Sequence, residues 1–212
     1  MQGRLIVFEG VEGSGKTTQL GAIASWLKNK VSPVPVVVTQ EPGGTELGSA
    51  LRQLLLQKQT FPLHDRAELF LFAADRVQHV EEVLKPQLEQ GSIILCDRYV
   101  ESTIAYQGYG RGLSLDLIHQ LNQLATVGLT SDLTLWLDVE IKIGLTRAKN
   151  RGVADRLEQA ALTFHSSVQQ GYRELAQAHP ERIVPIDASG SQEAVTARIQ
   201  EVLEQKLTEW YG

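Results

Sequence analysis

The sequence predicts an α/β protein with three layers, in which about five parallel strands form a sheet that helices cover on both faces. Short runs rich in Val, Ile and Leu alternate with longer segments of helical period along the 212 residues. Nearly continuous apolar runs are typical of parallel strands buried on both faces, and strand–helix alternation indicates right-handed βαβ crossovers. Ligands of such a sheet collect at the carboxyl ends of its strands.

Each expected strand is an almost continuous run of β-branched residues and leucine. In chain order the runs are Leu5–Phe8, Val34–Thr39, Ile93–Cys96, Leu133–Leu137 and Arg182–Ile186. The segments between them repeat apolar residues at helical spacing, and Ser114 is a favoured N-cap type just before one of them. The expected helices are Lys16–Lys30, Thr45–Gln57, Asp65–Gln90, Leu115–Thr126, Glu140–Lys149, Arg156–Ala178 and Gln192–Trp210.

Composition indicates a single globular domain over residues 1–212. The formal net charge of -5 disfavours a broadly basic face that would bind nucleic acid. The only cysteine, Cys96, lies in an apolar run, so we expect a buried thiol and a reducing compartment. The N-terminus lacks the apolar run of a signal peptide, and no stretch approaches the roughly 18 apolar residues of a membrane span. We therefore expect a cytoplasmic protein with no membrane partner.

The first strand leads into a glycine-rich loop of sequence GVEGSGKT, which matches the phosphate-binding P-loop pattern between a strand and a helix. Its backbone N–H groups and the helix N-terminus form an anion site. We expect Lys16 to reach the β- and γ-phosphates of a nucleotide and the Thr17 hydroxyl to bind Mg²⁺. The alternative is a strand–helix turn without a ligand. The loop consists of Gly10, Val11, Glu12, Gly13, Ser14, Gly15, Lys16 and Thr17.

Two further groups of residues favour a kinase that acts on a small molecule. Asp97 and Arg98 follow the third strand, where Asp97 would assist Mg²⁺ and Arg98 would clamp a phosphate; a structural ion pair is the alternative. Phe72 and Arg76 share one face of a helix, so a ring and a guanidinium could read a base together. Taken alone, a core Phe and a surface Arg explain that pair better.

Four cations fall within ten residues between two expected helices. They are Arg147, Lys149, Arg151 and Arg156. One interpretation is a solvated face; the other is a lid, at about residues 147–158, that closes arginines over phosphates. The segment GYGRG, which contains Tyr109 and Arg111, is equally compatible with a flexible loop and with the rim of a site.

These motifs, in this order, resemble the thymidylate kinases, a family of P-loop nucleoside monophosphate kinases. The resemblance covers nearly the whole chain, and its blocks are FEGVEGSGKTTQ, TQEPGGT, LFAADR, CDRY, STIAYQGYGRG, SDLTLWLD and NRGVADRLE. It implies the P-loop NTPase fold and transfer of a phosphoryl group from Mg·ATP to dTMP, which yields dTDP for dTTP synthesis. It also implies a homodimer built on helix packing.

The resemblance assigns roles to individual positions. The implied catalytic residues are Lys16, Arg98, Asp97, Arg151, Arg156 and Glu12, with Thr17 and Asp97 at the metal. The implied dTMP-binding residues are Glu41, Arg52, Phe72, Arg76, Arg98, Thr103, Tyr106 and Gln107. Among these, Phe72 would stack on thymine, Arg76 would bond to its edge, and Tyr106 would crowd the 2′ position of the sugar.

Two positions depart from patterns known in the family. Gly13 stands where one branch has a catalytic arginine, and the arginine-rich lid here resembles the bacterial arrangement instead. Gln40 stands where many bacterial relatives have arginine, so any role of that arginine is not carried over. A kinase for another nucleoside monophosphate or for a deoxynucleoside is the nearest alternative. A P-loop regulatory switch is the alternative from another class, but the chain has no N-K-x-D guanine-reading motif.

Overall fold

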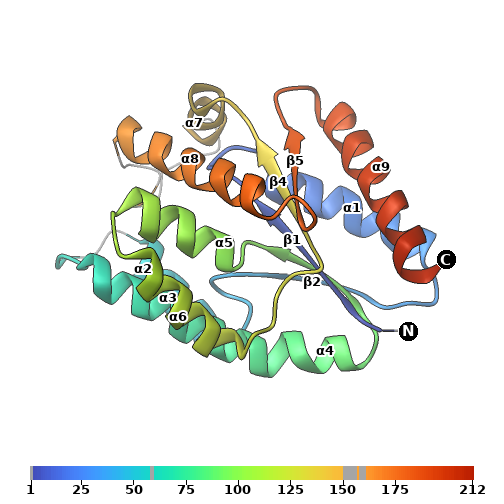
Figure 1. The fold of residues 1–212 in the computed structure, drawn as a ribbon, viewed down its shortest axis with the longest axis horizontal. Coiled ribbons are helices and arrows are strands. Elements are labelled where there is room, and N and C mark those ends of the chain that lie inside the picture. The colour runs from blue at the N-terminus through green and yellow to red at the C-terminus, as the bar shows by residue number, and fades with distance from the viewer. Residues whose placement is uncertain (1, 58–59, 150–156, 158–160) are drawn as a thin grey trace.

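The structure, a computed structural model, describes residues 2–57, 60–149, 157 and 161–212. Five parallel strands form one sheet in the order β2-β3-β1-β4-β5 (Figure 1). The strands are β1 (Arg4–Glu9), β2 (Val36–Gln40), β3 (Ile93–Asp97), β4 (Leu133–Asp138) and β5 (Ile183–Asp187). The predicted number and direction of strands are confirmed. The second strand begins two residues later than expected, after Pro35.

Helices cover both faces of the sheet, which gives the three predicted layers. On one face α1 (Lys16–Lys30) and α9 (Gln192–Tyr211) lie side by side (Figure 1). The other face carries α3 (Asp65–His79), the π-helical turn η1 (Val80–Leu84), α4 (Lys85–Glu89) and α8 (Leu162–Ala178). Further out lie α2 (Glu46–Leu56) and α6 (Leu115–Thr126), both packed on α3, and α7 (Ile141–Lys149), packed on α8.

Alternation along β1 assigns its side chains to the two layers. Leu5 and Val7 pack with Val80 and Leu84 of η1, whereas the neighbouring side chains of β1 belong to the larger core with α1 and α9. Because a strand points successive side chains to opposite faces, this pattern explains why the run is apolar at nearly every position. Cys96 is fully buried in β3, as predicted.

The segment after β3 was not predicted as a helix. It forms α5 (Val100–Thr103) and a second π-helical turn, η2 (Ile104–Gly110). Its glycines suggest a loop but serve close packing, since a Cβ at Gly110 would lie 2.6 Å from the ring of Phe164 on α8. The flexible-loop interpretation of GYGRG is therefore wrong for Tyr109, whose hydroxyl donates to Glu174 at 2.6 Å.

Other boundaries shift for local reasons. The long helix expected over Asp65–Gln90 is interrupted by η1 and ends at Glu89. Thr45 lies outside α2 as its N-cap, where its hydroxyl accepts from the Gly48 N–H at 2.9 Å. Ser114 caps α6 as expected, accepting from the Leu117 N–H at 3.4 Å. The expected start of the sixth helix at residue 156 lies outside the described residues.

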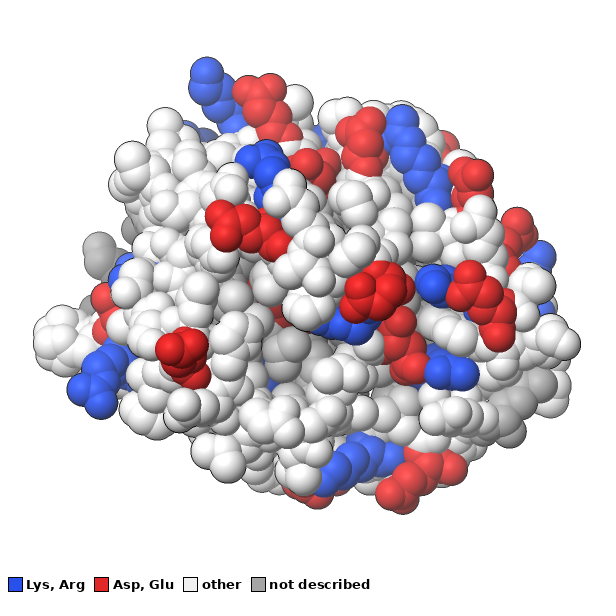
Figure 2. Space-filling view, viewed as in Figure 1, with Lys and Arg blue, Asp and Glu red and all other residues white. Residues whose placement is uncertain are grey.

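The surface carries both signs of charge. Acidic and basic side chains are interspersed over the face drawn in Figure 2, and the part over α6 is largely uncharged. Within the described ranges, every helix is too short or too polar to cross a membrane.

Candidate active site

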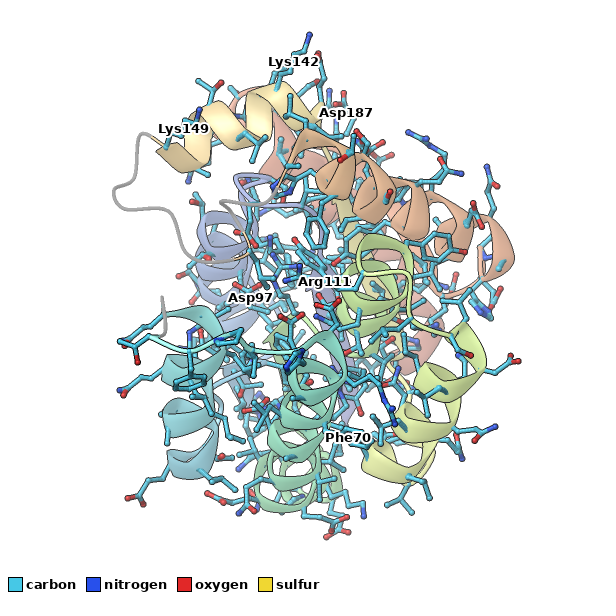
Figure 3. The ribbon with its side chains drawn as sticks, turned by 90° about the vertical axis from the view of Figure 1, so that its left-hand side faces the viewer. Phe70, Asp97, Arg111, Lys142, Lys149 and Asp187 are labelled. Carbon is cyan, nitrogen blue, oxygen red and sulfur yellow. The ribbon has the colours of Figure 1, made fainter. Side chains whose placement is uncertain are left out.

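A crevice of about 420 Å³ opens at the carboxyl ends of β1, β2 and β3. Loops after these three neighbouring strands meet there because the strands are parallel, as the sequence predicted. Figure 3 views the molecule from this end, with Asp97 and Arg111 near its centre. The predicted residues that line it are Glu12, Gly13, Gly15, Lys16, Thr17, Glu41, Arg52, Phe72, Arg76, Asp97, Arg98, Thr103, Tyr106, Gln107 and Arg147.

The glycine-rich loop holds its lysine inside the crevice wall. Lys16 is 7% exposed, and its ammonium donates to the carbonyls of Gly10 and Val11 at 3.0 Å each. Burial, followed by the nearby Arg98 guanidinium, lowers the pKa of Lys16 from its ordinary value. The ammonium of Lys16 is thus hydrogen-bonded to backbone carbonyls. An anionic ligand can take the place of these carbonyls as its partner.

Gly13 brings the loop into backbone contact with α7. Its φ is +71°, and a Cβ built there would lie 1.9 Å from the carbonyl oxygen of Gly144. A Cβ on Gly144 would in turn lie 2.5 Å from the carbonyl oxygen of Glu12. This contact explains why a glycine occupies position 13: an arginine there would collide with the helix that leads into the cationic segment.

Thr17 and Asp97 offer a pair of oxygen ligands. The exposed Thr17 hydroxyl donates to Asp97 Oδ2 at 3.2 Å, across the edge between α1 and β3. Oxygen ligands of this type fit Mg²⁺, which usually keeps several waters and phosphate oxygens in its octahedron. The residues present therefore suit the predicted metal site.

Arg98 lines the crevice and is held there by several hydrogen bonds. Its φ is +71°, and Nη1 donates to Gly10 O at 3.0 Å, Ser102 Oγ at 3.2 Å and the Tyr172 hydroxyl at 3.3 Å. Nη2 donates to the Glu12 carboxylate and, at 3.2 Å, to the Tyr106 hydroxyl. Burial acts to lower the pKa of Arg98, but the facing groups Tyr106, Glu12, Tyr172 and Glu9 outweigh it and raise the pKa. The guanidinium is thus both ion-paired and placed at the crevice.

Glu9, which the sequence analysis missed, organises the turn that carries Arg98. Its Oε1 accepts from the N–H groups of Tyr99 at 2.8 Å and Ser102 at 3.1 Å. Its Oε2 accepts from the hydroxyls of Ser102 at 2.6 Å and Tyr172 at 2.7 Å. Burial raises the pKa of Glu9, and Arg98, 3.9 Å away, opposes that rise. The signal that could have identified Glu9 is its position as an acidic residue at the carboxyl end of a buried strand. Asp97 was identified from the same position on β3.

Arg76 is buried and not on the surface, so the surface-Arg interpretation is wrong. It is 2% exposed and donates to Glu41 Oε2 at 2.8 Å, Asn122 Oδ1 at 2.7 Å and the Tyr99 carbonyl at 3.0 Å. Asn122 lies on α6 and was also missed, because nothing in its own segment indicates a contact 46 residues away. Phe72 lies beside Arg76 on the crevice wall and is partly buried.

The α5–η2 segment supplies three predicted substrate residues. Thr103, Tyr106 and Gln107 are all nearly fully buried, and each lines the crevice. Tyr106 packs edge to face on Phe164 and Tyr172, with ring centroids 6.1 and 6.4 Å away. Although π-helical turns are uncommon, they occur frequently at functional sites.

The loop after β2 is fixed by three basic side chains, those of Arg76, His79 and Arg52. Glu41, 4% exposed, accepts from Arg76 and contacts His79 Nδ1 at 2.8 Å. Arg52 Nη1 donates to the Pro42 carbonyl at 2.7 Å while it lines the crevice. Gln40 also lines the crevice, so the amide that replaces a common arginine faces the same space.

The structure describes only part of the predicted lid, the segment at about residues 147–158 that contains four cations. Arg147 lines the crevice and donates to the carbonyls of Ala188 at 3.0 Å and Ser189 at 3.3 Å. Leu157 also lines it. Arg151 and Arg156 lie outside the described residues, so their predicted roles stay predictions.

Comparison with known proteins gives one consistent result. The sequence model of the family described as Thymidylate kinase matches residues 8–199. A thymidylate kinase of Trichormus variabilis is 57% identical over 212 residues, which cover 99% of this chain and 100% of that protein. One of Nostoc punctiforme is 58% identical over 209 residues and 98% of both chains. A solved thymidylate kinase structure from Ehrlichia chaffeensis has a TM-score of 0.79 and 34% identity, and the match covers 96% of this chain and all of that one.

Asp75, which precedes Arg76 on α3, makes the stability of the fold depend on pH. It is 1% exposed, and its Oδ1 accepts from the Gly43 N–H at 3.0 Å. Burial and then the Glu41 carboxylate raise the pKa of Asp75 to about 6, against an ordinary 3.8, despite opposing effects of Gly43, His79 and Arg76. Between these two values the folded chain binds the extra proton, so ionisation of Asp75 lowers the free energy of unfolding as pH rises.

We expect Asp75→Asn to remove this contribution, because the amide oxygen keeps an acceptor for Gly43 without carrying a charge. Relative to the wild type, the variant should gain on the order of 2–3 kcal/mol in unfolding free energy between pH 4 and pH 7. Urea denaturation at both pH values measures the difference. A gap between the two proteins that stays constant with pH would show that Asp75 is ionised throughout.

Proposed function

The chain belongs to the thymidylate kinase family and phosphorylates dTMP to dTDP with ATP as the donor, and on that premise we propose how its crevice carries out the transfer. The observation that supports the proposal is a single crevice lined by the cations Lys16 and Arg98 as well as by Arg76 and Gln107. The proposal assigns phosphates to the first pair and the base to the second.

The donor end is the glycine-rich loop. The proposal assigns ATP phosphates to the backbone N–H groups of residues 10–17 and to the ammonium of Lys16, which exchanges its carbonyl partners for the β- and γ-phosphates. Thr17 and Asp97 hold Mg²⁺, which neutralises charge on the phosphates when it is bound. Arg147, with Arg151 and Arg156, closes over the same phosphates from the lid.

The acceptor end receives dTMP. Arg98 and Arg52 bind its phosphate, Glu12 lies near the 3′-hydroxyl, and Tyr106 crowds the 2′ position. Phe72 stacks on the base, while Arg76, Thr103 and Gln107 contact its edge and Glu41 holds Arg76 in place. All of these residues line one crevice, which supports their acting on a single molecule.

The reaction is an in-line displacement. An oxygen of the dTMP phosphate forms a bond to the γ-phosphorus while the bond from that phosphorus to the bridging oxygen of ADP breaks, and ADP leaves. The attacking oxygen is already anionic, so no strong general base is needed. Catalysis then consists of positioning, which contributes roughly 7–11 kcal/mol, and of charge neutralisation by Lys16 and the arginines.

We also propose the organisation around this site. One hydrophobic core contains residues of β1, α1, α8 and α9, which supports a single domain over 1–212 with a lid at about 147–158. A cytoplasmic location would supply ATP and keep the buried Cys96 reduced.

The exposed face of α3 supports a homodimer. Ala67, Phe70, Ala74 and Val77 recur on it at helical spacing, with Phe70 49% and Val77 46% exposed. The neighbouring helix α6 contains one charged residue, Asp116, and Leu124 on it is 76% exposed. Phe70 points outward from α3 in Figure 3. A stripe of this kind is covered most simply by its own copy across a two-fold axis.

Release of ADP, followed with Mg·ATP against a panel of nucleoside monophosphates, tests the function. We expect dTMP to be the best acceptor. A methyl pocket contributes only about 1–3 kcal/mol, so dUMP should be used roughly 10- to 200-fold less well, and dCMP and purine nucleotides less still. ADP release that is slow and independent of any acceptor would instead identify a nucleotide-binding switch.

The role of Arg98 is tested by Arg98→Ala, with Arg198→Ala on the exposed side of α9 as the matched control. Loss of a guanidinium from the transferring phosphates should lower kcat/KM by about 10³-fold or more, whereas the control stays near the wild type. Thermal melting shows whether each variant is folded. Normal turnover in folded Arg98→Ala would remove this residue from the mechanism.

The dimer is tested by Phe70→Glu, which places a charge in the apolar stripe. We expect the wild type to sediment as a dimer and the variant as a monomer in analytical ultracentrifugation, because an unpaired carboxylate is costly to bury. Leu162→Glu, at a leucine 59% exposed on α8, is the control and should stay dimeric. A monomeric wild type would contradict the proposal.

A further inference from the structure

A buried carboxylate lies behind the base-reading end of the crevice. Glu68 on α3 is fully buried, and so is the neighbouring amide of Gln107, which is 1% exposed on η2. Gln107 lines the crevice, whereas Glu68 and its cation Arg111 do not. Neither Glu68 nor Arg111 has a role in the mechanism above, so their place behind a substrate residue needs its own explanation.

The contacts of Glu68 fix the direction of the Gln107 amide. Gln107 Nε2 donates to Glu68 Oε1 at 2.7 Å. Arg111 donates to the same carboxylate, from Nη2 to Oε2 at 3.2 Å and from Nε to Oε1 at 3.4 Å. Both oxygens of the Glu68 carboxylate thus accept from Arg111, so the group of Gln107 that faces Glu68 has to be a donor. The NH₂ group of Gln107 must therefore face Glu68.

The opposite end of the amide is then an acceptor available to the ligand. Within the described part of the chain, Gln107 Oε1 has no hydrogen-bond partner. Arg76, on the same crevice wall, uses three of its five N–H groups for Glu41, Asn122 and the Tyr99 carbonyl, and a guanidinium only donates. The base-reading end thus combines a fixed donor with a fixed acceptor.

From this arrangement we infer that Glu68, held by Arg111, is a positioning residue that makes Gln107 an acceptor and thereby sets the choice between pyrimidines. A donor beside an acceptor matches a ring N–H next to a carbonyl, as in thymine and uracil. Cytosine presents the reverse pattern, an accepting ring nitrogen next to an amino group, so it leaves polar groups unpaired. The inference rests on the proposed binding of dTMP in this crevice.

Glu68→Gln tests it, because an amide both donates and accepts and so permits Gln107 to turn over. We expect kcat/KM for dTMP to fall and kcat/KM for dCMP to rise in absolute terms, each by about tenfold. A gain with a second substrate is an outcome that simple loss of stability would not produce. Glu101→Gln is the matched control: Glu101 is equally buried, pairs with Arg182 and lies outside the crevice lining, so its substrate ratio should stay that of the wild type.

Arg111→Met is the second variant, for use if Glu68→Gln does not fold. Without Arg111 the Glu68 carboxyl group loses the two N–H donors that fix it, so it no longer holds the Gln107 amide in one orientation. The variant should also raise kcat/KM for dCMP. If the wild type prefers dTMP but folded Glu68→Gln or Arg111→Met shows no such rise, the inference is overturned while the proposed function stands. A wild type that ignores dTMP would overturn the function itself.

Discussion

Burial of the Glu9 carboxylate is the constraint on which the geometry of the crevice depends. It lies at the carboxyl end of the central strand and has no access to water, so its oxygens must be satisfied within the protein. Four donors from the turn after β3, from α5 and from α8 meet it. A single carboxyl group thus joins segments about 90 and 160 residues away. Its hydrogen bonds to Tyr99 and Ser102 also fix the backbone just after Arg98. Arg98 itself has a left-handed backbone conformation, which costs roughly 1–3 kcal/mol.

The phosphate end and the base end are built on different principles. At the phosphate end, Gly13 and Gly144 let two backbones touch, so the loop that holds the donor and the helix that leads to the lid share one contact. At the base end, polarity is set by buried partners: three acceptors hold Arg76 and one carboxylate holds Gln107. The first arrangement requires the absence of side chains, and the second requires buried acceptors that orient the groups facing the ligand.

The sequence predicted the sheet and the residues that face the ligand better than it predicted what supports them. Strands such as Ile93–Asp97 are apolar at every buried position, and GVEGSGKT has a specific pattern, so both can be identified locally. The π-helical turn Ile104–Gly110 could not, because a wider helical period and two glycines obscure the 3.6-residue pattern. In the sequence, Glu9 looks like any residue that ends a strand, and Asn122 looks like any polar residue of a helix. Their importance arises only from contacts between distant segments.

The cations of the crevice already have partners within the chain, and this decides how ligands bind. Arg98 is paired with Glu12, Arg76 with Glu41, and Lys16 with two carbonyls. An anionic substrate therefore does not meet bare charges; it replaces weaker or competing partners at Arg98 and Lys16. Arg76, with 2% exposure and three acceptors, keeps its partners and offers only its remaining N–H groups. Because Arg98 and Lys16 exchange their partners for ligand phosphates, affinity varies with the charge of the ligand. Because Arg76 keeps its partners, base selectivity does not vary with that charge.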